Sequence, residues 1–259
     1  MADCAWVTGA GSGVGRAIAQ ALGSAGLQVA VSGRREGPVQ ETVAAIREAG
    51  GVALAVPVDV TEPRSVEEAY ARIRAEMGEV TVLVNNAGVH GGFARIVESD
   101  PDSWMRTLAT NVCGPYLTTR LCVPAMRAAG RGWIVQVGSA AGLAEPGDRS
   151  TDYVLSKVAL NYLTRQFAAD LHESGVVCCV IHPGEVRTGM WKAIHDDALA
   201  RGPEGEGALE WARMVDESGG DAPEKAAGLV LRILQSPPES VHGRFLWIED
   251  GIQSPRPTW

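Results

Sequence analysis

The chain has 259 residues, 46% of them hydrophobic, which allows one large core and does not require a second domain. Its formal net charge of −8 argues against general nucleic-acid binding, because such binding needs a basic surface that displaces counterions. The five cysteines have no spacing typical of a metal site, so we expect no metal, and reduced thiols fit a cytoplasmic location.

The chain does not open on a charged segment followed by an apolar one, so we expect no signal peptide. No apolar stretch approaches the ~20 residues needed to span a bilayer. We therefore expect a cytoplasmic protein with no membrane partner.

Short apolar runs alternate with longer helical patterns along the chain. Such runs, bounded by turn residues, are typical of strands that are buried on both faces of a parallel sheet. The alternation predicts one α/β domain, residues 1–259, with a doubly wound parallel sheet of about seven strands and helices on both faces. The expected strands are residues 4–8, 28–32, 52–58, 80–84, 133–137, 176–181 and 245–248, and helices are expected over 14–24, 41–48, 65–77 and 153–172.

A glycine-rich turn follows the first expected strand and opens the first helix. It reads Thr8-Gly9-Ala10-Gly11-Ser12-Gly13-Val14-Gly15. Glycine allows the tight turn and lets the backbone approach a pyrophosphate, which the N–H groups at the helix N-terminus can bind. The position of this turn in the chain predicts a dinucleotide-binding site.

The residues after the second expected strand indicate which dinucleotide binds. NAD sites usually place a carboxylate there, whereas this chain has Arg34 and Arg35 after Ser32-Gly33. A guanidinium is suited to a 2′-phosphate, so we expect NADP, with NAD as the alternative. Arg34 is the preferred phosphate ligand, and Arg35 either shares this role or is simply solvated.

Tyr153 and Lys157 are four residues apart in a helical pattern, so they lie on one face of the helix. A lysine ammonium at ~4 Å is worth about 4 kcal/mol to a phenolate at an effective dielectric of 20. We therefore expect Lys157 to lower the pKa of Tyr153 by up to about three units, toward the range of a general acid/base.

Two further polar residues are candidates for the same site. Ser139 follows the fifth expected strand, at the sheet edge where ligands bind in doubly wound folds, although it could equally cap a helix. Asn111 interrupts an apolar helical pattern, where an unpaired amide would be costly, so it needs a hydrogen-bonding partner.

The ordered set of motifs resembles the short-chain dehydrogenases/reductases, in the branch with a single domain of about 250 residues. The resemblance runs from Ala5 to about Thr188 and is weaker beyond. The matching motifs are Thr8-Gly9-x-x-x-Gly13-x-Gly15, Asp59, Asn85-Asn86-Ala87-Gly88, Asn111, Ser139, Tyr153-x-x-x-Lys157 and Pro183-Gly184-x-Val186-x-Thr188.

The resemblance implies a catalytic role for four residues. Tyr153 would be the general acid in reduction and the general base in oxidation, and Lys157 would lower its pKa and hold the nicotinamide ribose. Ser139 would polarise the carbonyl, and Asn111 would support a water-linked proton relay behind Lys157.

The resemblance also implies cofactor contacts. Asp59 and Val60 would contact the adenine, and Asn86, Ala87 and Gly88 would line the adenosine ribose. Val186 and Thr188, which follow Pro183-Gly184, would hold the nicotinamide carboxamide and a phosphate.

The chain departs from the family pattern near the expected substrate. The loop of residues 145–149 is one residue longer than usual, and Glu185 and Arg187 place unusual charge after Pro183-Gly184. These two charges either pair with each other or bind a polar substrate. Residues 186–220 contain no expected strand and predict one or two short helices that form a substrate lid.

The resulting hypothesis is an NADP(H)-dependent oxidoreductase acting on a small-molecule carbonyl/alcohol pair. The alternatives are a related epimerase or dehydratase and a non-catalytic dinucleotide sensor. Two helices near the site carry apolar stripes that favour association, and the resemblance implies a homotetramer or homodimer. The alternative is that residues 186–220 fold over the stripes and leave a monomer. The stripes comprise Tyr116, Leu117, Leu121, Cys122 and Met126 on one helix and Leu160, Leu163, Phe167 and Leu171 on the other.

Overall fold

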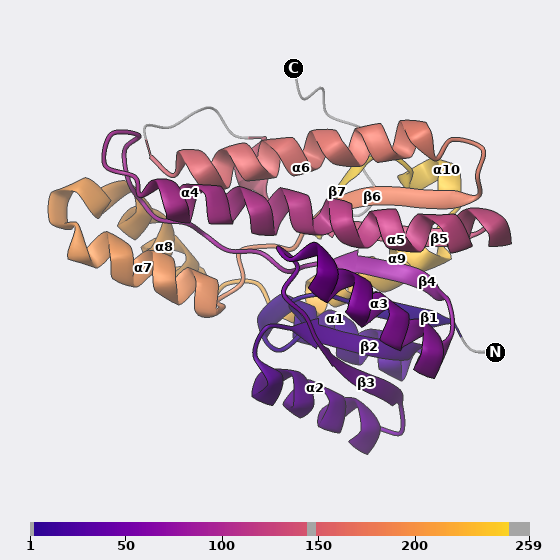
Figure 1. Ribbon diagram of the computed structural model, residues 1–259. Helices are drawn as coiled ribbons and strands as arrows, with labels where there is room; N and C mark the ends of the chain where they lie inside the picture. Colours follow the sequence, from indigo (N-terminus) through magenta and orange to yellow (C-terminus); the bar gives the residue numbers. More distant parts are fainter. Residues whose placement is uncertain (1–2, 144–148, 249–259) are drawn as a thin grey trace.

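The computed structural model describes residues 3–143 and 149–248 and contains a parallel sheet with helices on both faces (Figure 1). Seven strands of the described chain form the sheet, in the order β3-β2-β1-β4-β5-β6-β7, and every neighbouring pair is parallel. The expected fold class is therefore confirmed. The strands are β1 Cys4–Val7, β2 Gln28–Gly33, β3 Val52–Pro57, β4 Val80–Asn85, β5 Gly132–Val137, β6 Val176–His182 and β7 Phe245–Trp247.

The helices on one face bury the first of two cores. In α1 (Gly13–Ser24), Ile18 and Leu22 are fully buried against β1 and β2. α2 (Glu36–Glu48) and α9 (Pro223–Gln235) complete this layer, and α1 packs against α9. Apolar side chains three and four residues apart face the sheet, as expected of amphipathic helices.

The helices on the opposite face cover the second core. They are α3 (Pro63–Met77), α5 (Gly114–Ala129) and α6 (Thr151–Asp170), and α4 (Pro101–Leu108) packs against α6. Trp6 on β1 is fully buried here, and its indole N–H donates to the Ser32 hydroxyl at 2.8 Å. This layer positions α6, which carries Tyr153 and Lys157.

The apolar stripes expected on α5 and α6 are only partly free. Cys122, Met126, Leu160 and Leu171 are fully buried in the chain's own core, so the expectation that they form an assembly surface is wrong. These four side chains face the sheet, because the apolar stripe by which a helix packs on a sheet spans about a third of the helix surface. The remaining residues of the stripes are Tyr116, which is exposed, and Leu117, Leu121, Leu163 and Phe167, which are half-buried.

The segment expected as a lid is helical. α7 (Gly189–Ala200) packs against α8 (Glu206–Ser218), with a short 3₁₀ turn, Gly202–Gly205, between them. Figure 1 shows the two helices projecting beside α4 and the amino end of α6. No helix within the described residues is long and apolar enough to cross a membrane. The longer loop expected at residues 145–149 lies, apart from Arg149, outside the described residues.

Candidate active site

One cavity of about 970 Å³ lies at the carboxyl ends of the strands. In doubly wound sheets this edge is where ligands bind, because the loops after the strands diverge there. The cavity is lined by the turn after β1, the loops after β4, β5 and β6, and α6, α7 and α8. Its size is within the range of small-molecule and cofactor sites.

The glycine-rich turn forms one end of the cavity and is tied to the loop after β4. Gly9 and Gly13 have φ angles of +63° and +54°, which side chains with a Cβ rarely adopt. The Asn86 amide donates to the carbonyls of Thr8 and Gly9, both at 3.0 Å. The Thr8 hydroxyl accepts from the backbone N–H groups of Asn86 and Ala87, both at 3.1 Å.

This end of the cavity fits a dinucleotide. At Gly9 a Cβ would lie 2.7 Å from the Cα of Ala87, so the chain has no room for one. Ser12, the N-cap of α1, makes no side-chain capping bond, and no acidic residue occupies the first turn. The N-terminus of α1 is therefore suited to an anion such as a pyrophosphate.

All of the expected cofactor residues except Thr8 line the cavity. Thr8 is buried behind it and braces the turn through the hydrogen bonds described above. The lining residues are Gly9, Ser12, Gly13, Val14, Gly15, Arg34, Arg35, Asp59, Val60, Asn86, Ala87, Gly88, Tyr153, Lys157, Pro183, Gly184, Val186 and Thr188.

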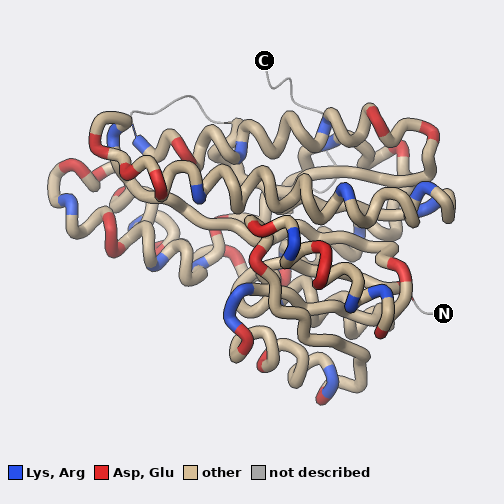
Figure 2. Tube along the Cα trace, viewed as in Figure 1, with Lys and Arg blue, Asp and Glu red and all other residues tan. Residues whose placement is uncertain are grey.

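Arg34 and Arg35 follow β2 at the same end of the cavity, and both side chains are exposed. Figure 2 shows this basic segment between β2 and α2. Neither guanidinium forms an ion pair with a residue of the described chain. Both can therefore reach an anionic group placed at the end of β2.

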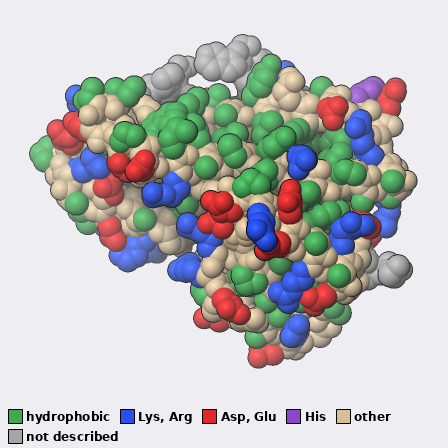
Figure 3. Space-filling model, in the orientation of Figure 1, with side chains coloured by type: hydrophobic (Ala, Val, Ile, Leu, Met, Phe, Trp, Pro, Cys, Tyr) green, Lys and Arg blue, Asp and Glu red, His purple; other side chains and the backbone are tan. Residues whose placement is uncertain are grey.

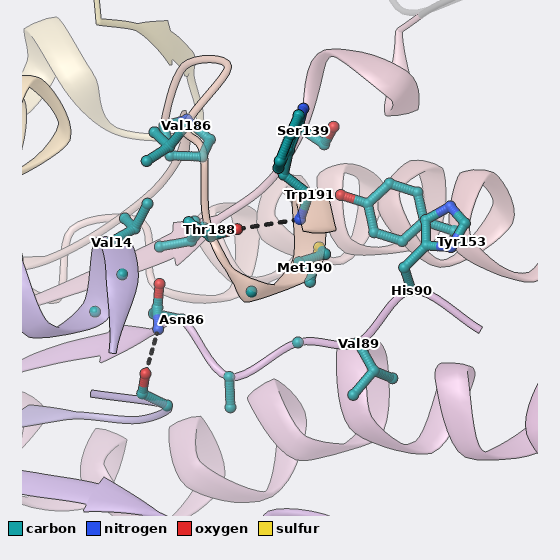
Figure 4. Close-up of a pocket in the computed structure, with 18 of the residues that line it drawn as sticks. Val14, Asn86, Val89, His90, Ser139, Tyr153, Val186, Thr188, Met190 and Trp191 are labelled. Carbon is teal, nitrogen blue, oxygen red and sulfur yellow. Dashed lines mark hydrogen bonds between the residues drawn. The ribbon is translucent and has the colours of Figure 1, made fainter. Parts of the chain in front are cut away.

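Tyr153 and Ser139 lie at the other end of the cavity (Figure 4), and Lys157 also lines the cavity. Ser139 follows β5, and its hydroxyl accepts the Ala141 N–H at 3.1 Å and acts to lower the pKa of the Tyr153 phenol. The Lys157 ammonium lies 5.6 Å from the centre of the Tyr153 ring and donates to the Val137 carbonyl at 3.0 Å. The structure thus brings together three of the four expected catalytic residues.

The expectation that Lys157 lowers the pKa of Tyr153 below its ordinary value is wrong, because this pKa is raised. Burial raises the pKa of Tyr153, while the hydrogen bond from Ser139 lowers it and the charge of Glu185 raises it further. Burial also lowers the pKa of Lys157 from 10.5 to about 8. The sequence-based value neglected desolvation, which disfavours both the phenolate and the ammonium.

Asn111 lies behind the cavity rather than on its wall. It is in a π-helical turn, Ala109–Cys113, between α4 and α5. Its Oδ1 accepts the Val89 N–H, and its Nδ2 donates to the Val89 carbonyl and the Ser156 hydroxyl, each at 2.9 Å. The partner expected for this buried amide is therefore present, and the amide ties α6 to the loop after β4.

Two histidines at the site were not identified from the sequence. His90 packs its ring 4.8 Å from the ring of Tyr153, and burial lowers its pKa, so the imidazole is neutral at pH 7. His182 accepts the Ala140 N–H at 3.2 Å and thereby braces the turn that holds Ser139. The position of His90 directly after Asn86-Ala87-Gly88-Val89 was the available signal.

Glu185 and Arg187 do not pair with each other, so the first of the two alternatives for these charges is wrong. Arg187 pairs with Asp216 of α8 at 2.9 Å, and its guanidinium lies 5.2 Å from the centre of the Trp191 ring. Glu185 lines the cavity, and its Oε2 accepts from the Trp211 indole at 3.0 Å.

The sequence matches the family model described as short chain dehydrogenase over residues 3–199. It is 34% identical over 195 residues to a short chain dehydrogenase of Pseudocercospora fijiensis, and the match covers 74% of this chain and 62% of that protein. It is 30% identical over 258 residues to the 3beta-hydroxysteroid dehydrogenase of Mediterraneibacter gnavus, covering 95% of this chain and 93% of that protein.

The fold is also similar to that of solved structures. A crystal structure of a variant of actinorhodin polyketide ketoreductase with NADPH superimposes with a TM-score of 0.86 at 28% sequence identity. The superposition covers 95% of this chain and 95% of that chain. The likeness therefore extends beyond residues 3–199, which the family model matches.

Proposed function

The chain belongs to the short-chain dehydrogenase family of NAD(P)-dependent oxidoreductases, and we propose that it transfers a hydride between NADP(H) and a carbonyl/alcohol pair. In this proposal Tyr153 is the general acid/base, and Ser139, Lys157 and Asn111 assist it. The observation that carries the proposal is the placement of Ser139, Tyr153 and Lys157 in the cavity that the glycine-rich turn also lines.

Tyr153 supplies the proton in carbonyl reduction. Burial keeps its pKa above the ordinary value, so the phenol is protonated at pH 7 and can donate to a developing alkoxide. In oxidation the phenolate form of the same side chain takes the alcohol proton.

Ser139 and His182 orient the reacting carbonyl. The Ser139 hydroxyl lies beside the phenol and is suited to polarise the same substrate oxygen. His182 acts through the Ala140 N–H, which fixes the turn containing Ser139. His90 packs against the Tyr153 ring and limits its rotation.

The cofactor site extends from Arg34 to Thr188. A bound nicotinamide dinucleotide supplies the hydride donor or acceptor. The N-terminus of α1 would hold its pyrophosphate, Asp59 and Val60 the adenine, and Asn86, Ala87 and Gly88 the adenosine ribose. Lys157 would bind the nicotinamide ribose, Val186 the carboxamide and Thr188 a phosphate. Arg34, with Arg35, favours NADP because a guanidinium can bind its 2′-phosphate.

Replacing the Tyr153 phenol tests the proposal. Tyr153→Phe keeps the ring but removes the acid/base hydroxyl, so kcat should fall more than tenfold while the Kd for NADPH changes little. Tyr162→Phe on the same helix is the matched control, because Tyr162 is exposed and lies outside the cavity. Hydride transfer to a panel of ketones, followed by NADPH absorbance, measures both. A Tyr153→Phe protein with more than a tenth of the original kcat would contradict the assignment.

A further inference from the structure

Glu185 is a polar group of the cavity that neither the acid/base chemistry nor the dinucleotide uses. Three contacts fix its position in the loop after β6. Its backbone N–H donates to Asp221 Oδ2 at 2.9 Å, and its Oε2 accepts from the Trp211 indole at 3.0 Å. Its Oε1 lies 3.7 Å from His182 Nε2. The carboxylate is therefore held on the cavity wall rather than free to swing into solvent.

No cationic side chain among residues 3–143 and 149–248 neutralises this carboxylate. His182 cannot, because burial lowers its pKa to about 4, so its ring is neutral at pH 7. Arg187 pairs with Asp216, and Lys225 pairs with Asp221 at 2.6 Å. A half-buried charge without a counterion is costly, and a ligand that brings a cation would relieve this cost.

Glu185 shares its cavity with the reacting centre. Its negative charge acts on the pKa of Tyr153, and both side chains line the same cavity. A substrate that places its reacting carbon at the phenol occupies the cavity whose wall carries Glu185. A cationic substituent is favoured over a neutral one by this charge.

Aromatic and apolar side chains also line the cavity, together with Arg149, which pairs with Glu204 at 3.5 Å. Phe93, Trp191, Ile194 and Trp211 line it. Figure 4 shows Trp191 on the same side of the cavity as Ser139 and the Tyr153 hydroxyl. Aromatic faces attract organic cations, and the Trp191 ring already contacts the guanidinium of Arg187. A carboxylate among aromatic side chains suits an alkylammonium group attached to an apolar body.

We infer that Glu185 binds a substrate ammonium group, and that the substrates are amino alcohols and aminoketones with the nitrogen one or two carbons from the reacting carbon. The inference rests on the proposed function above. The amine itself is not changed: in oxidation the carbinol carbon loses a hydride to NADP⁺, the hydroxyl proton passes to Tyr153, and a ketone forms. Reduction is the reverse.

Three alcohols of the same shape test this inference on the unaltered protein. In each compound the carbinol carbon bears a phenyl ring and a CH2 group. That CH2 group carries an ammonium in phenylethanolamine, a hydroxyl in styrene glycol and a methyl in ethyl phenyl carbinol. A fourth compound is the phenylethanolamine homologue with one more methylene before the nitrogen. With NADP⁺ at pH 7.5, kcat/KM for one of the two amines should exceed that for ethyl phenyl carbinol at least tenfold, because hydrogen bonds to charged groups are worth about 1.5–3 kcal/mol. No preference for either amine would overturn the inference.

A variant pair assigns the preference to Glu185. Glu185→Gln keeps the shape but removes the charge, and the ratio of kcat/KM for the amine to that for ethyl phenyl carbinol should fall at least tenfold. Glu206→Gln removes the same charge at the start of α8, where Glu206 pairs with Arg213, and should keep the ratio. An unchanged ratio in Glu185→Gln would overturn the inference. If this variant does not fold, the alcohol series on the unaltered protein still decides.

A binding measurement separates this inference from the proposed function. In the Tyr153→Phe background with NADP⁺, calorimetry should give a Kd for an amine at least tenfold lower than that for styrene glycol, and Glu185→Gln should abolish this difference. Equal Kd values overturn the ammonium site. Oxidation of ethyl phenyl carbinol without any amine preference leaves the proposed function intact and overturns only the inference. Glu185-dependent amine binding without oxidation of any alcohol supports the ammonium site and contradicts the proposed function.

Discussion

Lys157 is a fully buried lysine whose described contact is with a carbonyl rather than a carboxylate. Its Nζ donates to Val137 O at 3.0 Å, and burial lowers its pKa from 10.5 to about 8. The protein therefore keeps a charge where an apolar side chain would be more stable. Such a cost is typical of a site built for chemistry rather than for stability.

Lys157→Met should stabilise the protein while reducing activity. The pKa of Lys157 falls from 10.5 in the unfolded chain to about 8 in the folded protein. This difference lowers the free energy of unfolding by about 3 kcal/mol at every pH at which the lysine of the unfolded chain is protonated. Below pH 8 the cost is fully present, and it is lost as the pH rises toward 10.5. After the loss of the Val137 hydrogen bond, about 1 kcal/mol, the variant should gain about 2 kcal/mol at pH 7. Most of this gain should disappear by pH 10.

Urea unfolding of the cofactor-free protein at both pH values measures this effect. Lys192→Met is the matched control, because Lys192 is an exposed lysine that pairs with Asp196 on α7. The control should change the free energy of unfolding by less than about 0.5 kcal/mol. A Lys157→Met protein that is less stable than the unaltered protein at pH 7 would contradict the prediction.

Arg34→Asp should shift the cofactor preference from NADP toward NAD. The change removes a guanidinium beside the end of β2 and adds a charge that repels a 2′-phosphate. We expect kcat/KM with NADP to fall at least tenfold, as for the loss of one charged hydrogen bond. Arg64→Asp makes the same charge change on α3, where Arg64 pairs with Glu68, and should not alter the preference. Better use of NAD than NADP by the unaltered protein would refute the role of Arg34.

At the scale of elements, the strands were predictable and the environment of the site was not. Apolar runs and the glycines between β1 and α1 identify the sheet and its phosphate-binding end, because both are local patterns. The burial of Tyr153, the contact with His90 and the bond between Glu185 and Trp211 join residues that are distant in sequence. The direction of the Tyr153 pKa depends on this burial, which is why spacing alone gave the wrong sign.

The close approach of α1 to the loop after β4 depends on the absence of a side chain at Gly15. A Cβ on Gly15 would lie 2.3 Å from Asn86 Nδ2 and 2.6 Å from the Gly9 carbonyl. Gly15→Ala should therefore push Asn86 away from the turn and destabilise the protein by about 1–3 kcal/mol. Because Asn86 holds the turn in shape, the variant should also bind NADPH more weakly.

Gly37→Ala is the control for this element-scale prediction. Gly37 lies in the first turn of α2, and a Cβ there would meet no atom within 4 Å. Alanine in a helix is favoured over glycine by about 0.5–1 kcal/mol, so this variant should be unchanged or slightly more stable. Melting temperatures and NADPH fluorescence titrations compare the two. Equal behaviour of the two variants would show that the contact of Gly15 with Asn86 is unimportant.

At the scale of the whole molecule, an apolar surface remains on α5 and α6 after the core is complete. Tyr116 and Tyr162 are 47% and 57% exposed, and Leu155 is also exposed. Figure 3 shows hydrophobic side chains gathered over these helices. The surface is smaller than the sequence predicted, because Cys122, Met126, Leu160 and Leu171 face inward. Apolar patches of this kind favour association over exposure to water, against the repulsion between copies that each carry a net charge of −8.

We expect the protein to be a homodimer or homotetramer that pairs α5 and α6 across two-fold axes. Two-fold pairing covers the same surface on both copies, so one substitution acts twice at each interface. Light scattering at micromolar concentration should give two or four times the 27.3 kDa of one chain.

Tyr162→Glu should reduce this mass by placing a charge in the interface. Val52→Glu adds the same charge to a similarly exposed residue at the start of β3, at the edge of the sheet, and should leave the mass unchanged. A mass of one chain for the unaltered protein would refute the assembly, and loss of mass in both variants would place the interface elsewhere.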